Sequence, residues 1–313
     1  MTTFPEQAAT AGLLCLALPC PGARRSLAGA GRHSYTCRAM LAALGSRRVW
    51  AFAAALLVAG AALYGLGSIR HPPEGPRAGI VVSPPAVHPR APSGLHDAIR
   101  VGTFNIRRAR GRDGIGESWR TTVCMAGLDL LALQEVDGGT PLDTGVDQAR
   151  MFGRWLGLHS LYAAAERQFW HDHFGNALLS AAPVQQWVNI ALPRHDGPSY
   201  RSLLMARMEL LGRPVTVMVT HVDRRGDRPD QLAAVLDQFR RAEAPVLLLG
   251  DLNTSALAPE IAAIVTDPDI VAVNNGVDWV IARGFTAGAT TLCDVGGSDH
   301  ARLAVDLTFA DAP

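Results

Sequence analysis

From residue 98 onward, short apolar runs rich in β-branched residues alternate with stretches whose apolar positions recur every three or four residues. The short runs predict buried strands, and the longer period predicts amphipathic helices. The expected strands cover residues 98–106, 129–136, 174–180, 200–210, 213–221, 245–249, 277–283 and 301–309. The expected helices cover residues 116–128, 146–158 and 227–239. Strands with helices set among them predict a layered α/β or α+β domain in which helices cover sheets.

The pattern before residue 98 is different. Val49 to Ile69 is a run of 21 residues without a charge, long enough as a helix to cross a hydrocarbon core of roughly 30 Å. Arg47 and Arg48 precede it and only Arg70 follows closely, so the positive-inside rule places the N-terminus in the cytoplasm and the rest outside. Residues 71–95 contain seven prolines and are expected to form an extended spacer.

Four regions follow from this pattern: a basic cytoplasmic tail (1–48), a transmembrane or signal-anchor helix (49–69), a proline-rich linker (70–97) and a catalytic domain (98–313). An alternative stays open for the second region. The run could instead be the signal peptide of a protein that starts at Met40 and is cleaved near Ala59-Gly60-Ala61, which would make the domain secreted.

Charge is distributed unevenly along the chain. The 313 residues have a formal net charge of +1, from 29 basic and 28 acidic side chains. Residues 1–92 hold nine Arg and two acids, which leaves 20 Arg and 26 acids for residues 93–313. An acidic main body disfavours a protein that coats DNA without specificity through a basic surface, but it does not disfavour a nuclease. The sequence contains no Lys, so arginine, whose planar fork suits phosphate oxygens, is the main cation available for phosphate.

The cysteines do not decide the compartment. Cys15, Cys20 and Cys37 lie in the tail, and Cys124 and Cys293 lie in the domain. Their spacing predicts neither a zinc site nor a disulfide framework. A single disulfide between Cys124 and Cys293 is left open.

Acids, amides and imidazoles stand at the ends of the expected strands. They are Asn105, Glu135, His221, Asp251, Asn253 and the run Ser298-Asp299-His300. Oxygen ligands of this kind suit a hard cation such as Mg²⁺ or Mn²⁺. Neighbouring amide and imidazole groups can hold a phosphate and a water in line for attack.

Seven segments make the pattern specific. In chain order they are TFNIR, LALQEV, FGNALLS, VTHVD, LLLGDLN, VDWVI and GSDHARLAVDL. Together they resemble the endonuclease/exonuclease/phosphatase superfamily over residues 98–309. The resemblance implies a four-layer α/β/β/α sandwich of two packed mixed sheets, with the active site at one rim.

The resemblance also implies a metal site. Glu135 would be the main carboxylate ligand of Mg²⁺ or Mn²⁺, with Asn105 near the metal and the phosphate. Asp299 would lie at or near the metal.

Five further residues receive catalytic roles from the resemblance. Asp251 would activate water or protonate the leaving oxygen, and Asn253 would orient an oxygen. His300 is similar to the family's catalytic histidine, and Asp278 would hold its imidazole in one tautomer. His221 would donate to a phosphate oxygen in the transition state.

Asn176 and Arg201 are the expected substrate-binding residues, each with an alternative. Asn176 lies in a family motif but would serve equally as a buried amide that bonds to backbone. Arg201 stands where relatives often carry an arginine near the phosphate. The arginine-rich loops 107–114 and 223–230 could grip a phosphorylated substrate or simply be solvated.

The sequence thus predicts a membrane-tethered, outward-facing metal-dependent phosphoesterase that cleaves P–O bonds by in-line attack of water. A phosphodiester is favoured, because the tether makes a lipid headgroup attractive. Nucleic acid, a phosphomonoester and a non-catalytic binding module are the alternatives. Arg107 stands where some apurinic endonucleases carry an acid, which disfavours that subtype. No protein partner is evident, and a monomer is expected.

Overall fold

The computed structural model describes residues 47–73, 77–79, 97–110, 118–140, 145–197, 199–294 and 297–310. The predictions for the tail up to residue 46 and for most of the linker lie outside these residues. The chain divides into two compact units, Met1–Gly60 and Ala61–Pro313. Helix α2 (Arg47–Gly67) runs across the boundary between them.

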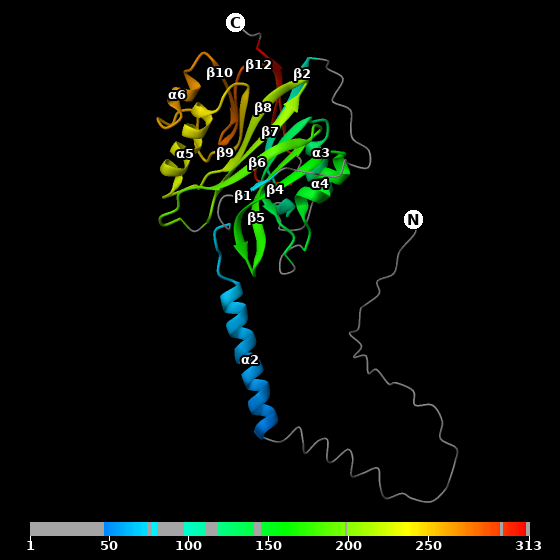
Figure 1. The fold of residues 1–313 in the computed structure, drawn as a ribbon, viewed down its shortest axis with the longest axis vertical. Coiled ribbons are helices and arrows are strands. Elements are labelled where there is room, and N and C mark those ends of the chain that lie inside the picture. The colour runs from blue at the N-terminus through cyan, green and yellow to red at the C-terminus, as the bar shows by residue number, and fades with distance from the viewer. Residues whose placement is uncertain are drawn as a thin grey trace, which may run out of the picture. The chain divides into compact units, whose positions relative to one another are not determined.

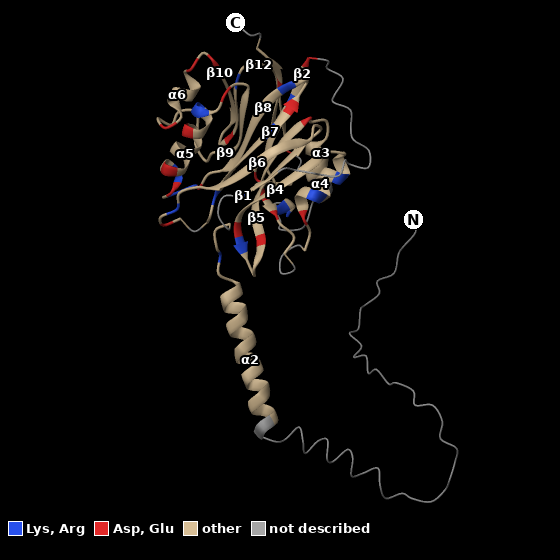
Figure 2. Ribbon diagram, in the orientation of Figure 1, with Lys and Arg blue, Asp and Glu red and all other residues tan. Residues whose placement is uncertain are grey.

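Helix α2 contains the predicted membrane-spanning run. The most apolar 18-residue window of Val49–Gly67 has a mean hydropathy of 2.0 and is not buried, so by length and composition the helix qualifies as a span. Figure 2 shows α2 without a charged side chain from residue 49 onward. An exposed apolar helix of this kind is typical of a signal or anchor segment.

The larger unit is built from two mixed sheets. The seven-stranded sheet has the order β1 (Arg77–Gly79), β6 (Val184–Ala191), β7 (Ser202–Leu210), β8 (Arg213–His221), β9 (Val246–Asp251), β11 (Asp278–Arg283), β10 (Ile270–Asn275). The six-stranded sheet has the order β12 (Phe285–Cys293), β13 (Arg302–Phe309), β2 (Ala98–Asn105), β3 (Leu130–Asp137), β5 (His171–Ser180), β4 (His159–Gln168). The pairs β2–β3 and β8–β9 are parallel, and the other pairs are antiparallel.

Helices cover the outer faces of both sheets. Figure 1 shows α5 (Arg228–Arg241) and α6 (Ala262–Val265) on one side, and α3 (Ser118–Met125) and α4 (Gln148–Leu156) on the other. Helix α4 starts at an N-cap aspartate, Asp147, which accepts from the backbone N–H of Arg150, and it ends at Gly157 with φ 68°. The predicted α/β/β/α sandwich is therefore confirmed.

Three apolar clusters hold the layers together. The central cluster lies between the sheets and includes Val101, Leu204 and Leu249. A second packs α3 and α4 against the six-stranded sheet, and a third packs α5 and α6 against the seven-stranded sheet. Both sheets are thus buried on two faces, which explains the nearly continuous apolar runs of β3 and β9.

Packing of the two sheets brings the strand ends of interest together. Asn105 ends β2 beside β3, while His221 and Asp251 are paired at the ends of the parallel strands β8 and β9. Asp278, at the start of the antiparallel strand β11, is also paired with Asp251. The polar ends therefore gather at one rim.

Five strands were missed by the sequence pattern: β1, β4, β6, β10 and β12. Four of them are sheet edges, where one long side of the strand lacks a neighbour. β12 is mostly exposed and carries Thr and Ala in place of an apolar run, and β6 is buried only at Val184 and Asn189. Residues 77–79, expected in the linker, instead pair with β6.

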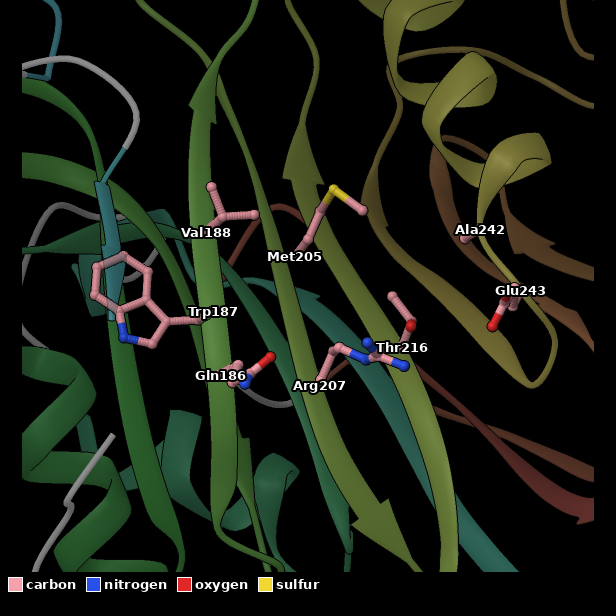
Figure 3. Close-up of a pocket in the computed structure, with 8 residues that line it drawn as sticks. All are labelled: Gln186, Trp187, Val188, Met205, Arg207, Thr216, Ala242 and Glu243. Carbon is pink, nitrogen blue, oxygen red and sulfur yellow. The ribbon is translucent and has the colours of Figure 1, made fainter. Parts of the chain in front are cut away.

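A groove lies on the outer face of β6–β8 beside the C-terminal end of α5 (Figure 3). Its volume is about 430 Å³. It is lined by Gln186, Trp187, Val188, Met205, Arg207, Thr216, Ala242 and Glu243. None of the predicted site residues borders it.

Candidate active site

Asn105 connects the two sheets at the rim. Its side-chain Nδ2 donates to Glu135 Oε1 at 3.2 Å and to Asp251 Oδ2 at 3.1 Å. Its Oδ1 accepts from the backbone N–H of Arg107 at 3.1 Å, which fixes the orientation of the amide. Asn105 is 1% exposed. One buried amide therefore holds two carboxylates near each other.

Glu135 adopts an unusual backbone conformation. Its φ is 55°, in the left-handed region, at an irregularity where the β3–β5 register shifts between Leu133 and Val136. A non-glycine residue held there costs about 1–3 kcal/mol, and such strain concentrates at functional sites. The irregularity lets a half-buried carboxylate meet Asn105 where the strand ends.

Asp251 lies at the centre of the site. Its Oδ1 accepts from the backbone N–H of Asn253 at 3.0 Å, while its Oδ2 lies 3.3 Å from His221 Nε2 and 3.8 Å from His300 Nε2. Burial, followed by the negative charge of Asp278, raises the pKa of Asp251 to about 6. A carboxylate destabilised in this way favours a nearby cation.

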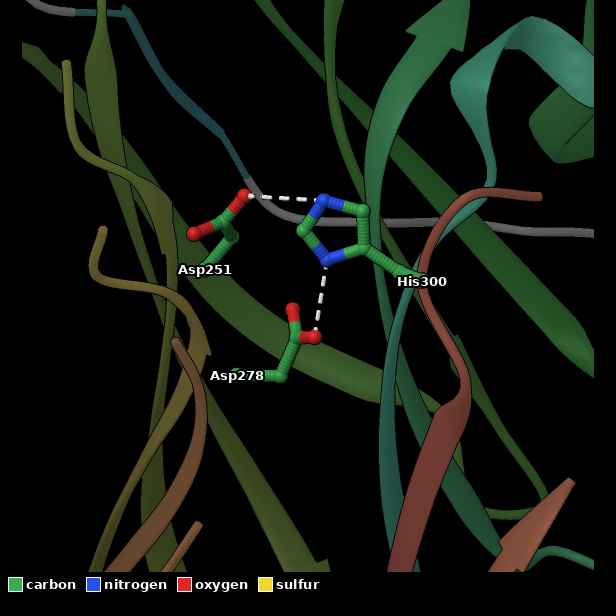
Figure 4. A group of neighbouring side chains, drawn as sticks. All are labelled: Asp251, Asp278 and His300. Carbon is green, nitrogen blue, oxygen red and sulfur yellow. Dashed lines mark hydrogen bonds and ion pairs between the residues drawn. The ribbon is translucent and has the colours of Figure 1, made fainter. Parts of the chain in front are cut away.

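His300 and Asp278 form a hydrogen-bonded pair, with Nδ1 and Oδ2 2.8 Å apart (Figure 4). Burial alone would lower the pKa of His300, but the hydrogen bond to Asp278 and the charges of Asp278, Asp251 and Asp299 raise it to about 9. Burial also raises the pKa of Asp278, against the opposing effect of His300. The imidazole is therefore held as a cation that faces Asp251.

His221 is held in the opposite charge state. Burial, together with the charges of Arg201 and His300, keeps its pKa well below the usual value, so the ring is neutral. Arg201 Nη1 lies 2.9 Å from His221 Nδ1, and a guanidinium can only donate. The ring proton therefore sits on Nε2, which points toward Asp251.

Asn253 is fixed from two sides. Its Nδ2 donates to the backbone carbonyl of Val222 at 2.8 Å, and its backbone N–H donates to Asp251 Oδ1 at 3.0 Å. Its φ is 47°, a conformation that asparagine tolerates better than most residues. Asp251 and Asn253 thus belong to one turn at the end of β9, and the carboxylate of Asp251 caps that turn.

Asp251, Asp278 and His300 offer ligand atoms that all lie within 4.8 Å of one another, a group that could hold a metal ion. The buried Oδ1 of Asp278 has no hydrogen-bond partner among the described residues. Two buried carboxylates whose pKa values are both raised by burial fit a hard divalent cation. The nitrogens of His300 already face the two carboxylates, so the acids fit the ligand role better than the ring does.

The remaining predicted residues are placed as follows. Arg201 is buried, and burial lowers its pKa against the charges of Asp223, Glu135, Asp251 and Glu166. Asp299 is exposed and contacts Ser298 Oγ at 3.4 Å. Asn176 is buried and its Nδ2 donates to the backbone carbonyl of Ser202 at 3.2 Å, a bond that joins the two sheets. This bond to the backbone corresponds to the alternative to substrate binding that the sequence left open for Asn176.

Ser298 was not assigned a role from the sequence. Its hydroxyl donates to the backbone carbonyl of Asn105 at 2.7 Å and accepts from the backbone N–H of His300 at 3.2 Å. Ser298 therefore positions the histidine loop against β2. The only signal in the sequence is that Ser298 stands two residues before His300.

Comparison with known proteins agrees with this geometry. A family model for endonucleases, exonucleases and phosphatases matches residues 102–300. The chain belongs to the endonuclease/exonuclease/phosphatase family. No curated protein sequence matches the chain.

Solved structures share the fold of this family member. A Beutenbergia cavernae endonuclease/exonuclease/phosphatase aligns with a TM-score of 0.59 at 22% identity, over 69% of this chain and 73% of that one. A mannosyl-6-phosphatase from Bacteroides thetaiotaomicron aligns with a TM-score of 0.54 at 16% identity, over 67% and 100%. D. rerio TDP2 with a single-strand DNA product aligns with a TM-score of 0.52 at 16% identity, over 67% and 99%.

Proposed function

We propose that this family member is a divalent-metal-dependent phosphoesterase that hydrolyses a phosphodiester on the extracytoplasmic side of a membrane. The convergence on Asp251 carries the proposal. Asn105 and His221 contact its carboxylate, and His300 faces it. His221 is neutral and His300 is cationic, and both rings face the buried carboxylate of Asp251. This arrangement is suited to acid–base chemistry.

Carboxylates of the site would hold the metal. Glu135 would be the main ligand beside the amide of Asn105, and Asp299 lies at the edge of the same cluster. Mg²⁺ or Mn²⁺ bound there would polarise a phosphoryl oxygen and offset its charge. The ligand set is oxygen-rich, as these hard cations require.

The side chains around the carboxylates supply the remaining chemistry. Asp251, with its raised pKa, would accept a proton from the attacking water or return one to the leaving oxygen. The Nε2–H of His221, oriented by Arg201, would donate to a phosphate oxygen. His300, kept as a cation by Asp278, would offset the negative charge that develops as water attacks in line.

Two features support an extracytoplasmic domain. The apolar helix α2 qualifies as a membrane span, and Cys124 and Cys293 form a disulfide that joins α3 to β12. Disulfides persist in oxidising compartments and are rare in the cytosol. Arg47 and Arg48 at the start of the helix support a cytoplasmic N-terminus. The retained helix makes a membrane phosphodiester the favoured substrate.

The test compares two small esters. Full-length protein purified in detergent would be given bis(p-nitrophenyl) phosphate or p-nitrophenyl phosphate, first with Mg²⁺ or Mn²⁺ and then with EDTA. We expect faster metal-dependent cleavage of the diester. Faster cleavage of the monoester would replace the proposal with a phosphomonoesterase, and an unchanged rate in EDTA would contradict the metal requirement.

A matched pair of variants assigns the activity to the site. Glu135→Gln removes a carboxylate charge at the rim and should lower the rate by about 100-fold or more, as loss of a transition-state contact does. Glu209→Gln changes an exposed acid on β7 and should leave the rate unchanged. Mg²⁺ should also raise the melting temperature of the wild type and not that of Glu135→Gln.

A further inference from the structure

A second cavity lies within the larger unit, on the side of the six-stranded sheet that carries the β4–β5 hairpin. Its volume is about 370 Å³. It is lined by Tyr64, Arg70, Arg108, Thr140, Gln168, Phe169 and His173. Two arginines and no carboxylate are among the described residues that line it.

The hairpin is tied to the last turn of α2. The backbone N–H of Phe169 donates to the carbonyl of Gly67 at 2.7 Å, and His71 and Arg167 exchange backbone hydrogen bonds of 2.9 and 2.8 Å. The rings of Tyr64 and Phe169 lie 5.5 Å apart. All of these residues belong to the same compact unit, so the cavity wall they form is continuous with the domain.

Arg108 lies in an unusual backbone turn beside the cavity. Residues 107–109 have φ values of 48°, 57° and 52°, three consecutive left-handed residues without a glycine. Such a turn costs roughly 1–2 kcal/mol per residue and persists only when its surroundings hold it. Gln148 Nε2 donates to the carbonyl of Arg108 at 2.6 Å, and the guanidinium stacks 4.9 Å from the centre of the Phe174 ring.

His173 leaves the charge of Arg108 intact. Arg108 Nη2 lies 2.9 Å from His173 Nε2, which must accept, so the ring proton is on Nδ1, 3.5 Å from Thr140 Oγ1. Burial and the charge of Arg108 lower the pKa of His173 to about 4, so this ring is neutral at pH 7. The cavity is thus lined by two charged arginines and by neutral hydroxyl, amide and imidazole groups from Thr140, Gln168 and His173.

Glu166 lies next to this cluster and forms an ion pair with Arg70. It is 1% exposed, 3.6 Å from Arg70, and its Oε2 has no hydrogen-bond partner among the described residues. Burial raises its pKa, while Arg70, Arg201 and Arg108 oppose that shift. The same carboxylate thus interacts with both cavity arginines and with Arg201 of the active site. The cavity and the active site therefore share one electrostatic environment.

Two exposed aromatic side chains lie near the cavity, at the end of α2 and at the tip of the β4–β5 hairpin. Tyr64 is 65% exposed at the end of α2, and Trp170 is 67% exposed at the tip of the β4–β5 hairpin. Tyrosine and tryptophan gather where hydrocarbon meets headgroups. Arg70, three residues after the end of α2, would then stand at the level of the lipid phosphates.

We propose that this cavity binds the phosphate of a membrane phospholipid headgroup between Arg70 and Arg108. The site requires α2 to remain as an anchor, which is part of the proposed function. Arg108 follows Asn105 by three residues, so a bound headgroup orients the catalytic rim relative to the lipid surface. Bidentate arginine contacts to phosphate supply the affinity.

The test measures lipid binding without hydrolysis. Full-length protein in dodecyl maltoside and EDTA would be titrated with phosphatidylglycerol, and bound lipid counted by native mass spectrometry. Arg70→Gln and Arg108→Gln should each weaken binding by about tenfold, the usual effect of losing a charge-assisted contact. Arg154→Gln, an exposed arginine on α4, should bind as the wild type does.

Two further arms make the result decisive. Arg70→Lys keeps the charge and should recover part of the binding, which a merely misfolded variant would not do. Inorganic phosphate at the same concentration should fail to displace the lipid; displacement would reassign the cavity to a soluble anion. Equal binding by Arg70→Gln, Arg108→Gln and wild type would overturn the site. Release of the chain from membranes by alkaline carbonate would instead contradict the anchor, independently of the cavity.

Discussion

Asn105 Nδ2 and Asp251 Oδ2 are joined by a 3.1 Å hydrogen bond, although the two residues lie 146 positions apart in the sequence. Asn105 ends β2 of the six-stranded sheet, and Asp251 ends β9 of the seven-stranded sheet. The same Nδ2 also reaches Glu135. One amide therefore sets the spacing of two carboxylates that belong to different sheets.

Asn105→Ala should impair catalysis more than folding. Without the amide, the two carboxylates lose their shared donor, and the pKa of Asp251 rises further because that hydrogen bond lowers it. We expect the rate of diester hydrolysis to fall by about 100-fold. The free energy of unfolding should fall by about 1–3 kcal/mol, the cost of leaving buried polar groups unpaired.

Asn189→Ala is the matched control. Asn189 is 2% exposed and its Nδ2 donates to the carbonyl of Ala164 at 2.7 Å, again between the two sheets but outside the candidate site. This variant should lose comparable stability and keep its rate. If both variants lost activity equally, Asn105 would be structural only.

His300 and Asp278 should act as a unit. Asp278→Asn removes the carboxylate that keeps His300 protonated and oriented, so kcat should fall by about 100- to 1,000-fold, and His300→Ala should cost a similar factor. The double variant should be little worse than either single one, because residues that act together are not additive. Steady-state kinetics measures this, with the exposed Asp237→Asn as control. Multiplicative losses would show that the two residues act independently.

The central strands and the rim were predictable because both are encoded locally. Apolar runs such as residues 245–249 end directly in polar side chains, so strand and site are marked by the same few positions. β4 and β12 were not predictable in this way, because an edge strand needs no continuous apolar run. The contact between Asn105 and Asp251 depends on the packing of the two sheets, which no local pattern reports.

The same limit applies to the cysteines. Cys124 and Cys293 pair across 169 positions, and neither lies in a motif that would announce the bond. Only the packing of α3 beside the end of β12 brings them together, with Cα atoms 5.6 Å apart. Arg302 bridges the same two elements, from Nε to the carbonyl of Cys124 and from Nη1 to Thr291.

Replacement of both domain cysteines by serine should lower stability without changing the site. A disulfide that closes so long a loop contributes about 2–5 kcal/mol, which corresponds to a melting temperature lower by about 5–15 °C for a domain of this size. Circular dichroism in detergent measures the shift, with Cys37→Ser as control. The rate at 25 °C should be retained. An unchanged melting temperature would show that the bond contributes little to the fold.

The stability of the domain should fall in mild acid because of His173. Its pKa is about 4 in the folded state and about 6.5 when the ring is solvated, so the unfolded state takes up the proton first as pH falls. The contribution of the neutral ring is fully present above pH 6.5 and is lost progressively between pH 6.5 and 4. Unfolding midpoints in urea across this range should therefore decrease, and His173→Gln should flatten part of that slope. His171→Gln, an exposed histidine on the same strand, should leave the slope unchanged, and equal slopes for all three proteins would exclude His173 as its source.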